Sequence, residues 1–215
     1  SKKWLEAMVN GFSDGSELVL GVGQYEKNES KLNKFIQLDT GFIALNYLSF
    51  ALADFPYMSV GRNVAYKKDL FYKVGGFKSH YDITSGDDDL FINQISKETR
   101  VGVVISYDAQ TTSVPKDDFK SFFMQKVRHV SAGFKYNQRN RFVLSLFYSL
   151  SVFWYLLFPI VLCYSRQLLV ILTIIVLKKL TMYSLIRRIF IKIEVSTKST
   201  MVFLAEFYSV FIHDL

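Results

Sequence analysis

Three carboxylates stand side by side at Asp87, Asp88 and Asp89 in a chain of 215 residues. Adjacent carboxylates repel one another, and a helix N-terminus is stabilised by one or two acids without needing a third. Helix capping is the structural interpretation of this run. The chemical interpretations are a metal site or a general base, which requires a carboxylate close to the hydroxyl that it deprotonates and neighbours that tune its pKa.

A second group of polar side chains, Gln125, Arg128 and His129, stands at positions i, i+3 and i+4. On a helix these side chains project from one face. Arginine can hold a diphosphate with its planar guanidinium, and glutamine or histidine can hydrogen-bond the hydroxyls of a sugar. The alternative is an amphipathic helix that lies on a membrane surface.

The other residues with metal-binding or nucleotide-binding chemistry form weaker patterns. His80 and His213 have no second ligand at metal-binding spacing, and we interpret both as ordinary histidines. Cys163 is the only cysteine, which excludes an intramolecular disulfide and a multi-cysteine zinc site. Gly21–Gly23 lacks the third glycine and the following helix of a dinucleotide loop, so it predicts a turn. None of these residues is therefore assigned as a metal ligand.

An α/β unit, predicted over the first 118 residues, must position the two groups. Apolar periodicity and caps predict helices at 30–52 with Ser30 as the cap, at Lys68–Val74 ended by Gly75 and Gly76, at Gly86–Ser96, and from Asp117 or Asp118 to about Ala132. Short apolar runs predict strands at Glu17–Gly21, at Tyr57–Tyr66 with a break at Gly61, at Arg100–Ser106 and at Gln110–Val114. The acids would then open one helix, and the Gln125 group would lie on the next.

The distribution of charge separates the two halves of the chain. Lysine and arginine total 26 against 19 acids, a net charge of +7, yet no acid occurs from Phe119 to Ile193. Such asymmetry indicates contact with nucleic acid or with a membrane. The uncharged run Phe142–Tyr164 favours a lipid bilayer over nucleic acid, because at about 1.5 Å per residue it would span a hydrocarbon core of roughly 30 Å. A buried core helix of a soluble protein is the alternative.

A second apolar run, Leu168–Leu177, can be extended to about Ile186 if Lys178 and Lys179 direct their ammonium groups toward water. The two runs would form a multi-pass hairpin with basic clusters at its base. The positive-inside rule places that base, and the preceding part of the chain, on the cytoplasmic side of the inner membrane. A third run, Met201–Ile212, carries Glu206 and predicts an interfacial or incomplete span.

Three stretches, in this order, resemble motifs of the membrane-bound family 2 glycosyltransferases, which include cellulose- and hyaluronan-synthase-like enzymes. Ser59–Lys68, followed by Val74–Phe77, resembles the family's G-x-N-x-A-F/Y-R/K-R/K and GGF segment. Ser85–Leu90 resembles its T/G-E/D-D motif. Gln125–His129 resembles its Q-x-x-R-W motif, and apolar runs follow it as the family's membrane helices do. The resemblance covers roughly residues 1–190.

The resemblance implies the C-terminal part of a GT-A (Rossmann-like) catalytic domain over residues 1–118, an amphipathic interfacial helix over 119–141 and membrane helices over 142–215. It assigns the general base to Asp88, with Asp87 in the preceding acidic position. It also implies inverting transfer from a nucleotide sugar, expected to be a UDP-sugar, to a glycan or lipid-linked acceptor. The residues implied to contact substrate are Gly61, Asn63, Gln125, Arg128 and His129.

Two departures from the family pattern matter. His129 stands where tryptophan is usual, and that tryptophan commonly stacks on the acceptor sugar. The family's first nucleotide-binding strand and its D-x-D metal motif should precede Trp4, so the resemblance implies that UDP and Mg²⁺ or Mn²⁺ bind mainly to residues outside this chain. We therefore expect the chain to be a fragment that holds the acceptor half of an active site and is inactive by itself.

Two other classes of protein explain part of the pattern. A non-enzymatic membrane-associated partner or lipid-binding protein would explain the basic helix, but neither the acidic run nor the Gly61–Lys68 segment. A metal-dependent phosphohydrolase would use Asp87–Asp89. Such enzymes gather carboxylates and histidines from separate elements, and the sequence contains no His–Asp pairing of that kind.

Overall fold

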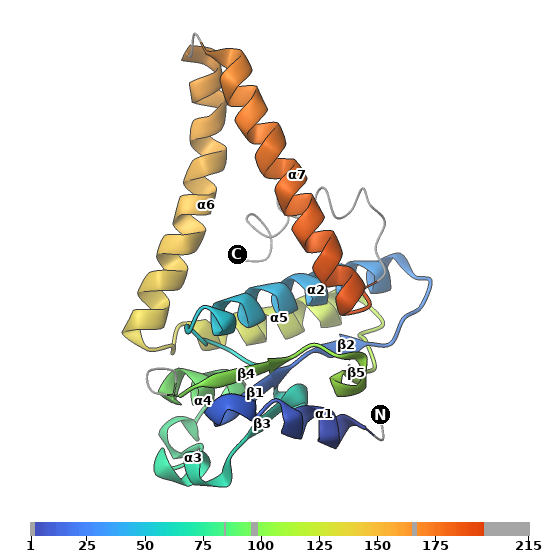
Figure 1. Ribbon diagram of the computed structural model, residues 1–215, viewed down its shortest axis with the longest axis vertical. Helices are drawn as coiled ribbons and strands as arrows, with labels where there is room; N and C mark the ends of the chain where they lie inside the picture. The colour runs from blue at the N-terminus through green and yellow to red at the C-terminus, as the bar shows by residue number, and fades with distance from the viewer. Residues whose placement is uncertain (1–2, 84, 96–98, 165–166, 196–215) are drawn as a thin grey trace.

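The computed structural model describes residues 3–83, 85–95, 99–164 and 167–195. Its strands and most of its helices form an α/β part, from which α6 (Gln138–Tyr164) and α7 (Leu168–Lys192) rise as a hairpin (Figure 1). The expected α/β class is confirmed, and helices predominate. The predicted apolar run Met201–Ile212 and His213 lie outside the described residues.

Two small sheets share one continuous stretch of chain, β1 (Leu18–Gly21) followed by β2 (Gly23–Tyr25). β1 is the centre of a three-stranded sheet, antiparallel to β3 (Val64–Tyr66) and parallel to β4 (Val101–Val104). In this register Leu18 lies opposite both Tyr66 and Val101. β2 pairs in parallel with β5 (Thr111–Ser113).

Two local predictions on these strands are corrected. The turn predicted at Gly21–Gly23 is wrong, because Val22 is buried and its carbonyl accepts a hydrogen bond from Thr111 N at 3.2 Å, which keeps the chain extended. The strand expected over Tyr57–Tyr66 is confirmed only at its end, as β3. Before it, Gly61–Asn63 form a 3₁₀ turn, η2, closed by a hydrogen bond from Asn63 N to Val60 O at 2.7 Å.

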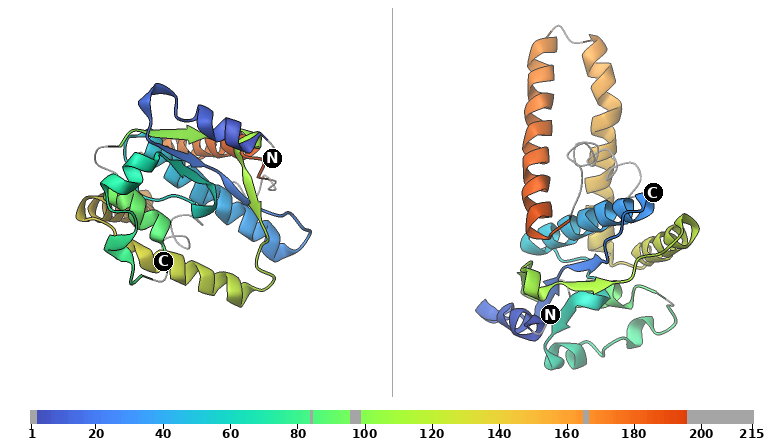
Figure 2. Two further views of the ribbon diagram at one scale, coloured as in Figure 1. Left: turned by 90° about the horizontal axis from the view of Figure 1, so that it is seen from below. Right: turned by 90° about the vertical axis from the view of Figure 1, so that its right-hand side faces the viewer.

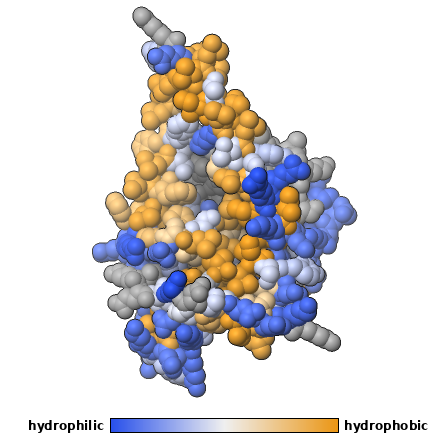
Figure 3. All heavy atoms as spheres, viewed as in Figure 1, coloured by the Kyte–Doolittle hydropathy of each residue, from blue (hydrophilic) through white to orange (hydrophobic). Residues whose placement is uncertain are grey.

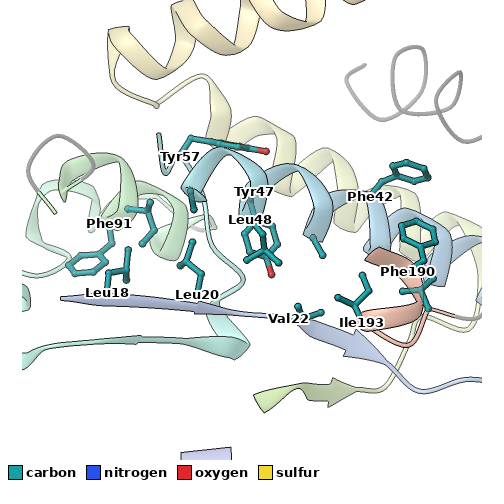
Figure 4. Close-up of a cluster of buried hydrophobic side chains, with 14 of the residues drawn as sticks. Leu18, Leu20, Val22, Phe42, Tyr47, Leu48, Tyr57, Phe91, Phe190 and Ile193 are labelled. Carbon is teal, nitrogen blue, oxygen red and sulfur yellow. The ribbon is translucent and has the colours of Figure 1, made fainter. Parts of the chain in front are cut away.

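The core lies on both faces of β1. Leu18, Leu20 and Val22 pack toward α2 (Lys31–Leu52) and α4 (Asp87–Ile95), as Figure 4 shows. Val19 points to the other face, where it packs with Met8 of α1 (Trp4–Asn10). The sheet is therefore covered by helices on two sides (Figure 2), and each fully buried aliphatic side chain contributes roughly 1.5–3 kcal/mol.

Helix ends follow their capping residues closely. Ser30 caps α2 by accepting from Asn33 N at 3.0 Å, as predicted. α3 (Lys68–Lys73) ends before Gly75 and Gly76, which have φ values of 77° and 61°. Glycine adopts such positive φ values readily because it has no Cβ. Of the two acids predicted to cap α5 (Phe119–Gly133), Asp118 is the cap, and it accepts from Ser121 N at 2.9 Å.

Three described helices, α2, α6 and α7, are long and apolar enough to cross a membrane, which suggests membrane association. They differ in what covers them, since 61% of the most apolar stretch of α2 is buried, against 0% for α6 and 6% for α7. Apolar side chains cover most of the face of the hairpin that is seen in Figure 3. α2 is therefore a core helix of the α/β part, whereas α6 contains the predicted span Phe142–Tyr164 with its apolar surface uncovered.

The last turns of α7 pack on the α/β part. Ile186, Phe190 and Ile193 are buried, and the Phe190 ring meets Phe42 of α2 edge to face at 5.3 Å. Gln24 Nε2 donates to Ile193 O at 2.6 Å. These contacts continue α7 to Lys192, beyond the expected end near Ile186.

Candidate active site

The first turn of α4 meets the turn η2 at the predicted base. Asp88 Oδ2 accepts a hydrogen bond from Gly61 N at 2.5 Å. A Cβ at position 61 would lie 2.9 Å from that same oxygen, so only glycine permits this approach. Gly61, predicted as a substrate contact, is thus in direct contact with Asp88.

Asp88 is half-buried, and burial is the largest cause that raises the pKa of its carboxyl above the usual 3.8. Backbone hydrogen bonds from Gly61 and Asp89 oppose this rise in pKa, and the negative charge of Asp87 adds to it. A carboxylate whose pKa is raised holds a proton more strongly than an ordinary aspartate. Asp88 therefore has the character that a general base needs.

The two neighbouring acids lie in different surroundings. Asp87 is exposed to solvent. Asp89 is 4% exposed, its Oδ1 accepts from Ser59 N at 3.1 Å, and its Oδ2 accepts from the Tyr136 hydroxyl at 3.1 Å. Burial, followed by the charge of Asp88, raises the pKa of Asp89 well above its usual range. Asp89 is thus occupied by protein partners, and of the three acids Asp88 alone is both partly buried and accessible.

Helix α5 brings the second predicted group beside the acids. Gly86, at φ 86°, opens α4, and a Cβ on it would collide with the Cβ of Ala132 in α5. α5 is in turn held along α2 by an edge-to-face contact between Phe122 and Phe35 at 5.8 Å and by an ion pair between Lys126 and the buried Asp39.

His129 is within electrostatic reach of Asp88. Its side chain is solvent-exposed, yet the surrounding protein desolvates its ring in part, and this lowers the pKa of the imidazole below its usual value. The positive charge of Arg128 lowers the pKa further, whereas the negative charge of Asp88 raises it. Asp88 and His129, both predicted as site residues, therefore lie near enough for their charges to interact.

Gln125 joins this site through a residue that the sequence did not point to. Its Nε2 donates to the Tyr25 hydroxyl at 3.2 Å, and the guanidinium of Arg62 lies 4.2 Å from the centre of the Tyr25 ring. Arg62 Nη2 also donates to Gly23 O at 2.9 Å. No motif marks Tyr25, which stands one hundred residues before Gln125, whereas the position of Arg62 between Gly61 and Asn63 was a usable signal.

Asn63 lies beneath the site. It is 1% exposed, its Nδ2 donates to Val22 O and Ala109 O at 2.7 and 2.8 Å, and its Oδ1 accepts from Trp4 Nε1 at 3.0 Å. These bonds hold η2, and with it Gly61, against the link between β1 and β2. The predicted contact between Asn63 and substrate stays a prediction.

Asp88 contacts Gly61 and lies within electrostatic reach of His129. Gln125 and the exposed Arg128 lie on the same helix as His129, and Gln125 bonds Tyr25. Such an arrangement offers a base of raised pKa beside cationic and hydrogen-bonding groups. It can deprotonate a hydroxyl and stabilise a departing anion.

Comparison with known proteins agrees with this chemistry. Searches of curated proteins and of solved structures gave no match. The model of glycosyl transferase family 21 matches residues 2–213. A match over nearly the whole length identifies the chain as a member of glycosyl transferase family 21.

Proposed function

We propose that this glycosyltransferase transfers a sugar with inversion from a nucleotide sugar to a hydroxyl acceptor, and that Asp88 is its general base. The observation that carries the proposal is the carboxylate of Asp88, half-buried and hydrogen-bonded to Gly61 N beside the Gln125–His129 face of α5. We also propose that the chain is related to the family 2 enzymes and that its α/β part belongs to a GT-A catalytic domain.

The proposed reaction is a single displacement. Asp88 takes the proton of the acceptor hydroxyl while that oxygen bonds to the anomeric carbon. The bond between this carbon and the nucleoside diphosphate breaks, and the diphosphate leaves with the electron pair. Arg128 offsets the negative charge on the leaving group, and electrostatic stabilisation of this kind often lowers the barrier more than any other effect. His129 and Gln125 hydrogen-bond hydroxyls of the acceptor sugar or its carrier.

The proposed substrates rest on the family 2 resemblance and on the surroundings of the candidate site. The donor is a UDP-sugar, as the family 2 resemblance implies. The acceptor is a glycan or a lipid-linked molecule, and the apolar hairpin beside the site favours an acceptor at the cytoplasmic face of the inner membrane. Because the positive-inside rule applies to the basic residues at the base of the hairpin, the catalytic part lies on the cytoplasmic side.

Mg²⁺ or Mn²⁺ would neutralise charge on the diphosphate when bound. Among the residues that the structure describes, no three His, Cys, Asp or Glu side chains come together to hold a metal ion. The described residues thus do not form a resident metal site, and no step of the proposed reaction is assigned to one. In the proposal the ion binds mainly to residues outside this chain.

Kinetics of an N-terminally extended protein test the base assignment. Asp88→Asn keeps the shape of the side chain but cannot accept the proton, so we expect kcat to fall by about 10²- to 10⁴-fold. Nucleotide binding, measured by calorimetry, should be retained. Arg128→Lys should also lower kcat, because lysine keeps the charge but loses the planar fork that grips two phosphate oxygens.

Asp69→Asn, at an exposed acid in the first turn of α3, is the matched control and should keep most of the activity. If Asp88→Asn turned over at a near-normal rate, the base would be another group. If neither Asp88 nor Arg128 mattered, a capping role for the acids and a membrane-surface role for α5 would describe the molecule better.

A further inference from the structure

A buried polar cluster joins α4 to the start of α6. Asn93 of α4 is 5% exposed, and its Nδ2 donates to Tyr57 O at 2.5 Å and to Asp89 O at 3.0 Å. Its Oδ1 accepts from Asn140 Nδ2 at 2.8 Å and from Asn137 N at 3.3 Å. Both polar atoms of this amide are therefore used, each by more than one partner.

Two of the partners of Asn93, Asn137 and Asn140, lie at the start of the hairpin. Asn137 precedes α6, its Oδ1 accepts from Asn140 N at 2.9 Å, and its Nδ2 donates to Asn93 O at 2.8 Å. Asn140 is 1% exposed, and it is the buried residue of α6. Asn137, whose side chain caps the first turn of α6, thus also binds α4.

A second connection lies one turn earlier on α4. The Tyr136 hydroxyl donates to Asp89 Oδ2, so Asp89 is tied to the segment between α5 and α6. The Tyr136 ring packs against Tyr57 with a centroid distance of 6.3 Å, and Tyr57 O is also an acceptor for Asn93. Asp89 and Asn93 stand four residues apart. The hydrogen bonds from Tyr136 and Asn140 therefore reach the same face of α4.

Two helices can pack together through apolar side chains alone, so a buried polar cluster between α4 and α6 needs a separate explanation. Buried polar groups lower stability unless every one finds a partner, and apolar residues would join two helices without that condition. A satisfied polar network instead fixes one geometry, since its bonds are directional. The fixed element is the helix that carries Asp88, next in sequence to Asp89.

We infer that Asp89, Asn93, Tyr136 and Asn140 are positioning residues, which fasten α4 and its Asp88 to the first turn of the apolar hairpin. The inference rests on the proposed function of Asp88 and extends it, because it connects the base to the part of the chain that enters the membrane. A shift of about 1 Å in a reacting group can lower a rate by roughly 100-fold, so the connection matters for turnover even where the fold survives.

A double-mutant cycle on the N-terminally extended protein tests the inference. Tyr136→Phe removes the hydroxyl that donates to Asp89 and keeps the ring. Asp89→Asn replaces the carboxylate that accepts this hydrogen bond. Each should lower kcat by about 10- to 100-fold while KM for the nucleotide sugar stays within about twofold. Because both act through one hydrogen bond, the double variant should be little worse than either single variant, whereas two independent structural losses would multiply.

Asn140→Ser supplies a second variant in case the first pair lowers the amount of folded protein, and it should show the same fall in kcat at unchanged KM. Tyr183→Phe, in α7 and away from the cluster, is the matched control and should leave kcat and the melting temperature unchanged. A higher KM or a lower melting temperature at normal kcat would overturn the positioning role. So would multiplicative losses in the double variant.

The Asp88→Asn result separates this inference from the proposal that it extends. If Asp88→Asn is inactive and the cluster variants keep normal kcat, the base assignment stands and the positioning role is wrong. If Asp88→Asn is active, both are wrong.

Discussion

Asp87, Asp88 and Asp89 are neighbours in the chain and yet occupy three environments: solvent, the contact with Gly61, and the buried pairing with Tyr136. Successive residues on a helix turn by about 100°, which directs each carboxylate to a different surface. A run that looks uniform in sequence therefore occupies three separate environments, and the middle acid combines partial burial with access to solvent.

The raised pKa of Asp88 predicts the pH dependence of transfer. A base acts only when deprotonated, so activity should be full above its pKa and fall as the pH drops through it. Because the pKa lies above the usual 3.8, the acidic limb of kcat/KM should begin at a higher pH than an ordinary aspartate would give. The measurement is the pH–rate profile of the N-terminally extended protein.

The same pH–rate profile can contradict this prediction in two ways. An acidic limb at or below the usual aspartate range would mean that the group titrating in the free enzyme is not the half-buried Asp88. An Asp88→Asn variant that kept the limb unchanged would assign it to another residue.

At the scale of elements, the site depends on how closely α4 approaches α5 and η2. Glycines stand at both approaches: Gly61 against Asp88, and Gly86 against Ala132. Gly86 also has a positive φ of 86°, a conformation that costs other residues roughly 1–2 kcal/mol. Gly61 therefore lets η2 approach Asp88 closely, and Gly86 lets α4 approach α5.

Gly86→Ala should destabilise the protein by at least about 1–2 kcal/mol, because the new methyl group meets both the unfavourable φ and the Cβ of Ala132. Thermal unfolding in detergent measures the effect, and transfer activity should fall with it. Gly133→Ala is the matched control, since a Cβ there meets nothing within 4 Å. Equal stability of the two variants would contradict the close packing of α4 on α5.

At the scale of the whole molecule, an α/β part with a buried core carries a hairpin whose apolar side chains are exposed (Figure 3). Exposed apolar surface of this extent is unfavourable in water and marks a contact with lipid or protein. The basic residues before α6 and at the end of α7 lie at the base of the hairpin, where the site is also found. The candidate active site is thus next to the surface that is proposed to contact the membrane.

We expect the protein to behave as an integral membrane protein. After carbonate extraction it should remain in the membrane pellet, because the most apolar stretches of α6 and α7 are only 0% and 6% buried among the described residues. A monodisperse protein in the soluble fraction without detergent would contradict the membrane role of the hairpin.

Transfer activity should also require residues upstream of Trp4. We expect residues 1–215 alone to show no nucleotide-sugar turnover and an N-terminally extended protein to be active, since the donor-binding strand and the D-x-D motif are expected before Trp4. The comparison of turnover at equal protein concentration decides this. Equal rates in the two proteins would show that the donor site lies within these 215 residues.

Features that depend on near neighbours in the chain could be predicted from the sequence. The caps Ser30 and Asp118 begin their helices where expected, Gly75 and Gly76 follow the end of α3, and the uncharged run Phe142–Tyr164 lies within one helix. Caps, positive-φ glycines and apolar runs act within a few residues of themselves, so they are readable without the fold.

Features that depend on packing were decided only by the tertiary structure. α2 and α6 both have the composition of a membrane span, and only the sheet beneath α2 makes it a core helix. Likewise Asp89 meets Tyr136 across 47 residues and Gln125 meets Tyr25 across 100, and no local pattern records these pairs. The physical reason is that burial and hydrogen-bond partners depend on which distant segments pack together, whereas helix ends depend on the residues beside them.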